Sequence, residues 1–220
     1  MRKVHKMILI AVAGLTMVGC VSVNNIPLTT DATTAIKNRN VVTAKHEKPD
    51  FSAMTAGKAT FAMLGAVASI SSGNEIVAKN NIEDPADYIS EKLNTTLSAK
   101  HGSRVSSKSV SVKEDDVQAI SKNNPDIDLL LDIRTINWSF NYFPTTWNKY
   151  RVIYSARLRL IDVKGKRVMA EGFCARVPDE TPTSPTYDEL LANDAERLKK
   201  ELRNAADFCV AEFKSKVLQL

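Results

Sequence analysis

The sequence predicts an α/β fold, in which helices pack on a mixed β-sheet as an α+β sandwich and a long amphipathic helix ends the chain. Two observations support this prediction. The elements follow the order strand, helix, strand, helix, then three strands and a helix, and such an order builds helices onto a sheet. The strands are marked by alternating apolar residues, and the last helix by apolar residues at three- and four-residue steps. A chain of 220 residues suits one domain with a tether.

The amino terminus has the features of an export signal. Met1–Lys6 carries positive charge, and Met7–Val18 is an uncharged run of twelve residues, shorter than the roughly 20 that span a bilayer. The run ends in Met17-Val18-Gly19-Cys20, which resembles the bacterial lipobox, where the cysteine is diacylated and becomes the first residue of the mature protein. An ordinary signal peptide that happens to end in a cysteine is the alternative.

The lipobox resemblance implies a signal peptide at 1–19 and lipidation of Cys20. Val21 stands where an aspartate would retain a lipoprotein in the inner membrane. The resemblance therefore implies the outer membrane of a Gram-negative cell, with the domain facing the periplasm. Residues 20–35 are interpreted as the lipidated cysteine and a flexible tether, and residues 36–220 as a single periplasmic domain. Two or more acyl chains hold a protein firmly at a membrane.

The first strand is expected at Arg39–Lys45. The segment between Lys58 and Glu75 contains no charge and is rich in small residues. Three glycines recur every eight residues within it or beside it: Gly57, Gly65 and Gly73. Small residues on one side of a helix allow a neighbouring backbone to approach closely. We interpret the segment as a close-packed helix or helical hairpin, and a membrane-touching or oligomer-forming element is the alternative.

A second helix is bracketed by its own start and stop signals. Asp84 can cap it, Pro85 suits its first turn, and Gly102 can adopt the left-handed conformation at its end. A strand is expected at Arg104–Val112, where apolar and polar residues alternate. A short helix is expected at Glu114–Ser121.

The next strand is expected to be interrupted. Its apolar residues alternate on one face as far as Ile133, and from Ile136 onward they have the opposite parity. A strand cannot exchange its two faces without an extra residue, so we expect a bulge or break near Arg134–Thr135.

Two further strands are joined by a tight loop. Tyr150–Asp162 places its apolar residues on one face and three arginines on the other: Arg151, Arg157 and Arg159. We interpret the arginine face as solvated, with contact to an acidic partner as the alternative. Val163-Lys164-Gly165 is expected to form a three-residue hairpin loop with the glycine in the left-handed position, and Lys166–Val177 to form the returning strand.

Cys174 and Cys209 are expected to form a disulfide. The final helix, from Tyr187 to about Val217, carries Cys209 on its apolar stripe. If the residues that flank the hairpin loop oppose each other, Tyr154 opposes Cys174, so Cys174 lies on the sheet face that the helix covers. An even number of cysteines in an exported domain fits a disulfide. Two free, buried thiols are the alternative.

The domain resembles the periplasmic α/β lipoproteins of the curli-secretion and TolB amino-terminal type. The resemblance covers about 39–220. It rests on the helix at Asp84–Gly102, on the buried strand that begins Asp126-Ile127-Asp128-Leu129-Leu130-Leu131, and on the Leu158–Gly165 hairpin. It implies an envelope protein built on a sheet with packed helices.

Charge and residue type restrict the possible functions. Three of the 30 basic side chains lie in residues 1–19, which leaves 27 basic against 25 acidic side chains, a net charge of +2. This balance gives no reason to expect nucleic acid as a partner. We expect no catalytic residue, cofactor or metal site. The remaining histidines, His46 and His101, are interpreted as surface positions, and Asp126, Asp128 and Asp132 as solvated edge residues.

An aromatic cluster surrounds the turn near residue 145. Aromatic side chains of this kind anchor interfaces, and they also fill cores. We expect part of the cluster to meet a partner or a membrane surface. The candidate partner-binding residues are Trp138, Tyr142, Phe143, Trp147 and Arg151.

The expected function is therefore that of a membrane-anchored periplasmic lipoprotein with a non-catalytic, partner-binding or envelope-assembly role. Its expected partners are the membrane, through the lipid, and other envelope proteins. The alternative is a subunit of an oligomeric outer-membrane secretion pore, in which the uncharged segment contacts the membrane. The sequence leaves the oligomeric state open.

Overall fold

The computed structural model describes residues 24–220, so the predicted signal peptide at 1–19 and the predicted lipidation site at Cys20 lie outside the described residues. The strands are β1 (Asn40–Lys45), β2 (Ser52–Met54), β3 (Arg104–Ser111), β4 (Leu129–Phe143), β5 (Thr146–Asp162) and β6 (Arg167–Arg176). The helices are α1 (Thr30–Ile36), α2 (Ala56–Ala59), α3 (Ala62–Lys79), α4 (Pro85–His101), α5 (Val117–Asn123), α6 (Tyr187–Glu212) and a π-helical turn at Phe213–Leu218.

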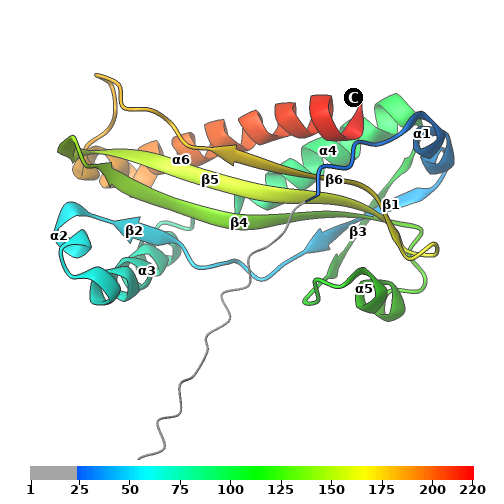
Figure 1. Ribbon diagram of the computed structural model, residues 1–220, viewed down its shortest axis with the longest axis horizontal. Helices are drawn as coiled ribbons and strands as arrows, with labels where there is room; N and C mark the ends of the chain where they lie inside the picture. Colours follow the sequence, from blue (N-terminus) through cyan, green and yellow to red (C-terminus); the bar gives the residue numbers. More distant parts are fainter. Residues whose placement is uncertain (1–23) are drawn as a thin grey trace, which may run out of the picture.

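These strands form one mixed sheet with the order β3-β1-β4-β5-β6, and β2 pairs with β4 further along the same edge that β1 uses. Helices α4 and α6 cover one face of the sheet, while α2, α3 and α5 lie on the other side (Figure 1). The predicted α/β fold with helices on a mixed sheet is confirmed.

The largest core lies between the sheet and the α4–α6 layer. It takes the alternating apolar residues of β4 and β5 together with the inner faces of the two helices. A smaller core lies on the opposite face under α5, around Leu130, Ile120 and Ile161. On this opposite side of the sheet, α5 lies at one end and α2 and α3 lie at the other (Figure 1). A polar stretch separates them.

The predicted interruption of β4 is confirmed as a bulge. Thr135 pairs with Ala156, but Asn137 pairs with Ser155, so Ile136 is the extra residue. The bulge lets Leu131 and Ile133 on one side of it, and the aromatic residues on the other, face the same core.

The expected geometry of the β5–β6 loop is wrong in two details. Lys166, with φ 50°, is the residue in the left-handed region, and Asp162 pairs with Arg167 rather than Lys166. Gly165 serves close approach instead, because a side chain there would come within 2.6 Å of the Asp162 carboxylate. A second register shift at Leu160/Ile161 places Cys174 opposite Ala156 rather than Tyr154, which is still on the predicted face.

Helix α4 has the predicted ends. The Asp84 carboxylate accepts from the Ala86 N–H, and Gly102 ends the helix at φ 68°. The C-terminal helix differs from the prediction, because residues 192–195 have non-helical φ/ψ values and split it. Asn193 and Asp194 lie in the left-handed region, which asparagine and aspartate tolerate better than most residues.

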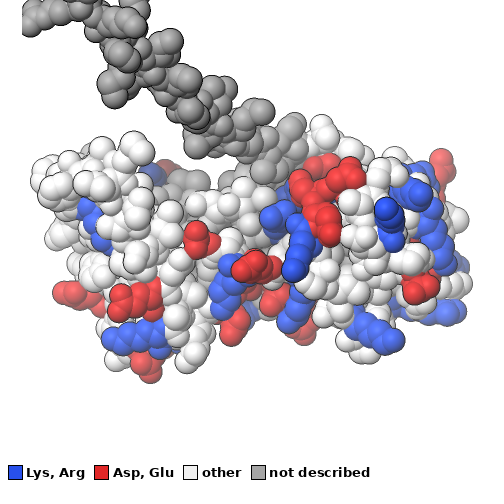
Figure 2. Space-filling view, turned by 90° about the horizontal axis from the view of Figure 1, so that it is seen from below, with Lys and Arg blue, Asp and Glu red and all other residues white. Residues whose placement is uncertain are grey.

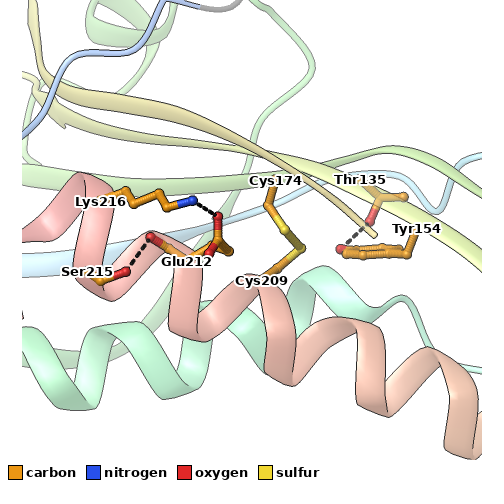
Figure 3. Close-up of a disulfide and its surroundings, with 7 residues drawn as sticks. All are labelled: Thr135, Tyr154, Cys174, Cys209, Glu212, Ser215 and Lys216. Atoms are coloured by element: carbon orange, nitrogen blue, oxygen red, sulfur yellow. Dashed lines mark hydrogen bonds and ion pairs between the residues drawn. A yellow bond between two sulfur atoms is a disulfide. The ribbon is translucent and has the colours of Figure 1, made fainter. Parts of the chain in front are cut away.

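The predicted disulfide between Cys174 and Cys209 is confirmed, with the two α-carbons 5.5 Å apart (Figure 3). Cys174 on β6 and Cys209 on α6 are both buried. The bond joins the edge strand β6 to the helix that covers it.

The segment expected as a flexible tether is largely docked on the domain. Ile26 and Glu171 exchange two backbone hydrogen bonds of 2.8 Å, and the Leu28 N–H donates to the Val217 carbonyl at 2.7 Å. Leu28 is buried, and α1 follows at Thr30. The Asn and Thr content of this segment is typical of a tether. However, Thr29 caps α1, and Leu28 and Ile36 enter the core.

We expect the Cys174→Ala, Cys209→Ala double variant to lose about 3–4 kcal/mol of stability, because the 34-residue loop is no longer closed in the unfolded chain. Urea unfolding of the purified, unreduced protein measures the loss. Thiol counting on the unfolded, unreduced chain is the companion test, and two reactive thiols from this pair would contradict the disulfide.

Candidate functional site

One end of the molecule exposes an unusual amount of apolar surface. The side chains of Phe61, Met63, Leu64 and Val67, at the start of α3, are 68%, 84%, 77% and 68% exposed. Ile70 continues the same face at 38% exposure. Large hydrophobic side chains normally line the inner face of a helix that packs on a domain, but in this half of α3 they line the outer face.

The inner face of α3 is made of small residues. Gly65, Ser69 and Gly73 are its buried positions in this region. A β-carbon on Gly65 would overlap the Lys58 carbonyl, and one on Gly73 would overlap the Phe51 carbonyl, both within the 3.0 Å that real β-carbons respect. The small residues therefore let the α3 backbone pack directly on α2 and on the β2 segment. The predicted close-packed helix is confirmed, and Gly57 takes no part in the contact.

The one charged residue at the start of this segment faces inward. The Lys58 ammonium donates to the Ala53 carbonyl at 2.9 Å and to the Ser72 hydroxyl. Burial lowers the pKa of Lys58. Residues 59–74, from the end of α2 through the first two thirds of α3, contain no charged side chain, and this end of the molecule is the mostly uncharged area at the left of Figure 2.

Trp147 lies at the same end. Strand β2 pairs with the last part of β4, with Met54 opposite Asn141, and α2 begins two residues after Met54. The β4–β5 turn follows directly, and Trp147 stands just beyond it with 69% of its surface exposed. We call Phe61, Met63, Leu64, Val67, Ile70 and Trp147 the apolar end. Its members include the five most exposed large hydrophobic side chains of residues 24–220.

The other predicted partner-binding residues are less accessible than Trp147. Trp138 and Phe143 are buried, and the Trp138 indole donates to the Pro49 carbonyl at 3.1 Å, so neither is available to a partner. Tyr142 is half-buried and packs against the main core. Arg151 is also half-buried, with its guanidinium 5.3 Å from the centre of the Phe143 ring. Trp147 is therefore the most exposed of the predicted partner-binding residues.

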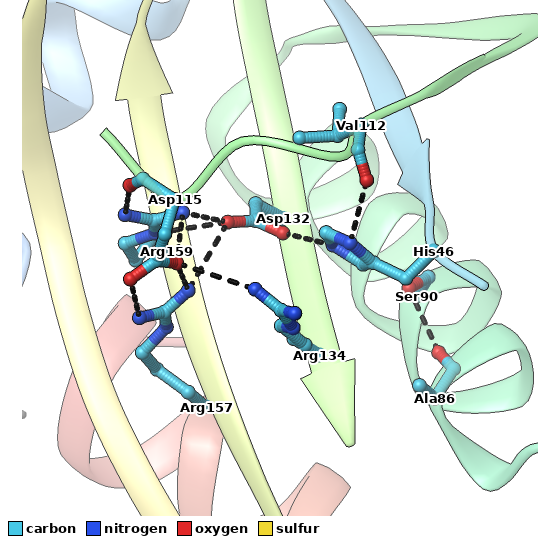
Figure 4. A network of polar contacts seen from close by, with 9 residues as sticks. All are labelled: His46, Ala86, Ser90, Val112, Asp115, Asp132, Arg134, Arg157 and Arg159. Atoms are coloured by element: carbon cyan, nitrogen blue, oxygen red, sulfur yellow. Dashed lines mark hydrogen bonds and ion pairs between the residues drawn. The ribbon is translucent and has the colours of Figure 1, made fainter. Parts of the chain in front are cut away.

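A buried ion network fills the polar stretch between α5 and α3 (Figure 4). The Asp132 carboxylate accepts from Arg159 at 2.6 and 2.9 Å and contacts the His46 imidazole at 2.5 Å. Asp115, on the loop before α5, holds the Arg157 guanidinium from above and also contacts Arg159 at 3.3 Å.

This network overturns three sequence-based interpretations. Asp132 is fully buried rather than a solvated edge residue, and Arg157 and Arg159 are buried rather than on a solvated face. His46 is largely covered rather than a surface histidine. The loop that carries Asp115 covers this face of the sheet through contacts with Arg157 and Arg159. The local sequence pattern does not predict these contacts.

Charge compensation governs the network. Burial raises the pKa of Asp132, but the hydrogen bond from His46 and the charge of Arg159 lower it more. The pKa of this carboxyl therefore lies below its ordinary value. The other His46 ring nitrogen faces the Val112 carbonyl at 3.1 Å, so both ring nitrogens have a hydrogen-bond partner. The hydrogen bond from Arg157 lowers the pKa of Asp115.

An open cleft of about 560 Å³ lies over this network, lined by both signs of charge. Its lining includes Arg134 and Arg157 as well as Asp84 and Asp115, so it does not favour a ligand of one charge. Within residues 24–220 no group of three or more acidic, histidine or cysteine side chains is arranged to hold a metal ion. In that same range, no helix combines the length and apolar character that crossing a membrane requires.

No protein-family model matches the chain, and no curated protein matches it. A PelC dodecamer structure from Paraburkholderia phytofirmans matches 91% of this chain and 99% of its own, with 13% identity and a TM-score of 0.36. The structure of a putative neuraminyllactose-binding hemagglutinin homolog from Helicobacter pylori matches 90% of this chain and 88% of its own, with 10% identity and a TM-score of 0.31. The structure of lipoprotein GNA1162 from Neisseria meningitidis matches 79% of this chain and 99% of its own, with 12% identity and a TM-score of 0.29. Similarities of this size say nothing about what the chain binds.

We expect Gly73→Ala to destabilise the protein by about 1–3 kcal/mol, because the new methyl group pushes α3 away from the Phe51 backbone. Gly57→Ala is the matched control, since a β-carbon there meets nothing within 4 Å. Urea unfolding compares the two variants. Equal stabilities would show that the close contact does not hold α3 in place.

Asp132→Asn is expected to cost about 3–5 kcal/mol at pH 7, because it removes the nearest and fully buried counter-ion of Arg159. The exposed Asp126→Asn is the control and should change stability by less than about 0.5 kcal/mol.

The same pair of variants tests a pH dependence. The folded-state pKa values of Asp132 and Asp115 are depressed, so their contribution is complete above the unfolded value of about 3.9 and is lost as the pH falls below it. The unmodified protein should lose stability on acidification below about pH 4 more steeply than Asp132→Asn does. Parallel curves would contradict the role of Asp132.

Proposed function

We propose that this chain is a lipid-anchored protein of the periplasmic face of the outer membrane, and that it acts without catalysis, by binding another envelope component through its apolar end. The observation that carries the proposal is the exposed apolar face of α3, with Trp147 also exposed at the same end of the molecule. Contiguous apolar surface of this kind marks a site of contact with a protein or a membrane.

The anchor is supported by the lipobox-like Met17–Cys20 segment behind an uncharged run. The Cys174–Cys209 disulfide supports an oxidising compartment, where such bonds persist. Val21 supports the outer membrane, because aspartate is absent from the position that retains lipoproteins in the inner membrane.

A binding role fits the way the apolar end is built. Gly65 and Gly73 fix α3 against the backbone of α2 and β2, so the exposed side chains stand on a rigid support. A rigid surface loses less conformational freedom on binding than a loop does.

The alternative, a subunit of an oligomeric outer-membrane secretion pore, would use the same surface in a ring. The small-residue face of α3 is already occupied within the chain, so it is not free to join subunits. The size of the detergent-extracted protein separates the two functions, since a large ring favours the pore and a monomer favours the binding protein.

Cys20→Ser should release the protein from membranes and abolish labelling with radioactive palmitate, because the acyl chains supply the stable membrane affinity. Membrane fractionation in the native cell measures the release. Val21→Asp is the matched control, which should keep its lipid label and move to the inner-membrane fraction. Palmitate labelling of Cys20→Ser would contradict the lipid anchor.

A further inference from the structure

We infer that the component bound by the apolar end is the lipid leaflet itself, so that the protein lies on the membrane at two places, its acylated cysteine and its apolar end. This inference rests on the proposed function for the anchor and names the partner of the same surface.

The chemistry of the surface suits lipid. Its exposed members are aliphatic or aromatic, and no charged residue occurs between Lys58 and Glu75. Lys58 itself is hydrogen-bonded inward to Ala53 and Ser72. Trp147 has an exposed ring, and tryptophan is the side chain that most favours the headgroup level of a bilayer.

The shape of the support suits shallow insertion. The exposed residues 63, 64, 67 and 70 follow helical spacing along the outer face of α3. A helix with one apolar face lies in the plane of the interface, with that face buried in the outer part of the leaflet. The inner face cannot turn outward, because Gly65 and Gly73 hold it against neighbouring backbone.

The short connection to Cys20 brings the leaflet close to the domain. Because Ile26 is paired with Glu171, only the five residues 21–25 lie between Cys20 and the docked chain, and the six residue-to-residue steps span about 20 Å when fully extended. The docked segment therefore leaves much less slack than the fifteen-residue tether suggested by composition.

The two attachment places are well separated along the sheet. Ile26 is bridged to Glu171 of β6, which pairs with Arg159 of β5, which in turn pairs with Asp132 of β4. The β2 strand that leads into the apolar end pairs with β4 as far as Asn141. Nine residues of strand correspond to about 30 Å, more than the connection can reach. A single leaflet can hold both places when the long axis of the domain lies along the membrane.

Fluorescence can test this inference in the mature Cys20→Ser chain, residues 20–220, which carries neither the acyl chains nor the uncharged run at 7–18. Trp138 is buried and Trp147 is exposed, and the chain has two tryptophans, so a change on lipid addition reports on Trp147. We expect a blue shift on adding vesicles of phosphatidylethanolamine with phosphatidylglycerol, and quenching when the acyl chains carry bromine. This measurement needs no substitution in the apolar end.

Variants then assign the binding to α3. Leu64→Glu, at a 77% exposed position, should lower the vesicle partition coefficient at least about tenfold and leave the thermal midpoint unchanged. Val105→Glu, 52% exposed on β3, is the matched control and should bind like the parent chain.

Two results would overturn the inference. One is the absence of both the blue shift and the bromine quenching at saturating lipid. The other is a dimer or ring without lipid whose formation removes the exposure of Trp147, which would identify a second copy as the occupant. Neither result bears on palmitate labelling of Cys20, so failure of the lipid contact is distinguishable from failure of the anchor.

Discussion

The antiparallel pairing of β4 with β5 is the interaction on which the rest of the fold depends. These are the two longest strands, and β1, β2 and β6 each use one of their free edges. The bulge at Ile136 keeps a single apolar face along the whole hairpin, so α4 and α6 can cover it from end to end. Without the extra residue, the aromatic half of β4 would point away from that core.

The hairpin is also long enough to separate two kinds of chemistry on its opposite face. Near the α5 end, Asp115 and Asp132 neutralise buried arginines and fasten a long loop to the sheet. Near the β4–β5 turn, the β2 segment widens the sheet and gives α3 a backbone surface to rest on. The buried charges at one end and the exposed apolar surface at the other thus rest on different residues.

Local patterns predicted most of the elements because their signals lie in neighbouring residues. The Asp84 cap, the parity change near Thr135 and the cysteine on the helix stripe are of this kind. The sequence also predicted the close-packed α3, but not that its large residues would face outward, because small residues on one side do not state what covers the other. The uncharged run was the available signal.

The errors share a different origin. His46, Asp132 and Arg159 are 27 or more residues apart in the chain, and no periodicity reveals that Asp115 closes over them. Parity shows which side chains share a face of a strand, but it does not show whether a distant loop buries that face. Likewise, the segment before α1 matches a linker in its Asn and Thr content, while its docking depends on hydrogen bonds to β6 and to the C-terminal turn.

The docking of Ile26 and Leu28 also determines how mechanical load enters the domain. Any pull between the amino-terminal segment and the domain acts first on the hydrogen bonds to Glu171 of β6 and to Val217 of the last turn. These two acceptors belong to parts of the chain that the Cys174–Cys209 bond joins covalently. Tension is therefore shared between an edge strand and the helix over it, and it cannot peel β6 from the sheet while leaving α6 behind.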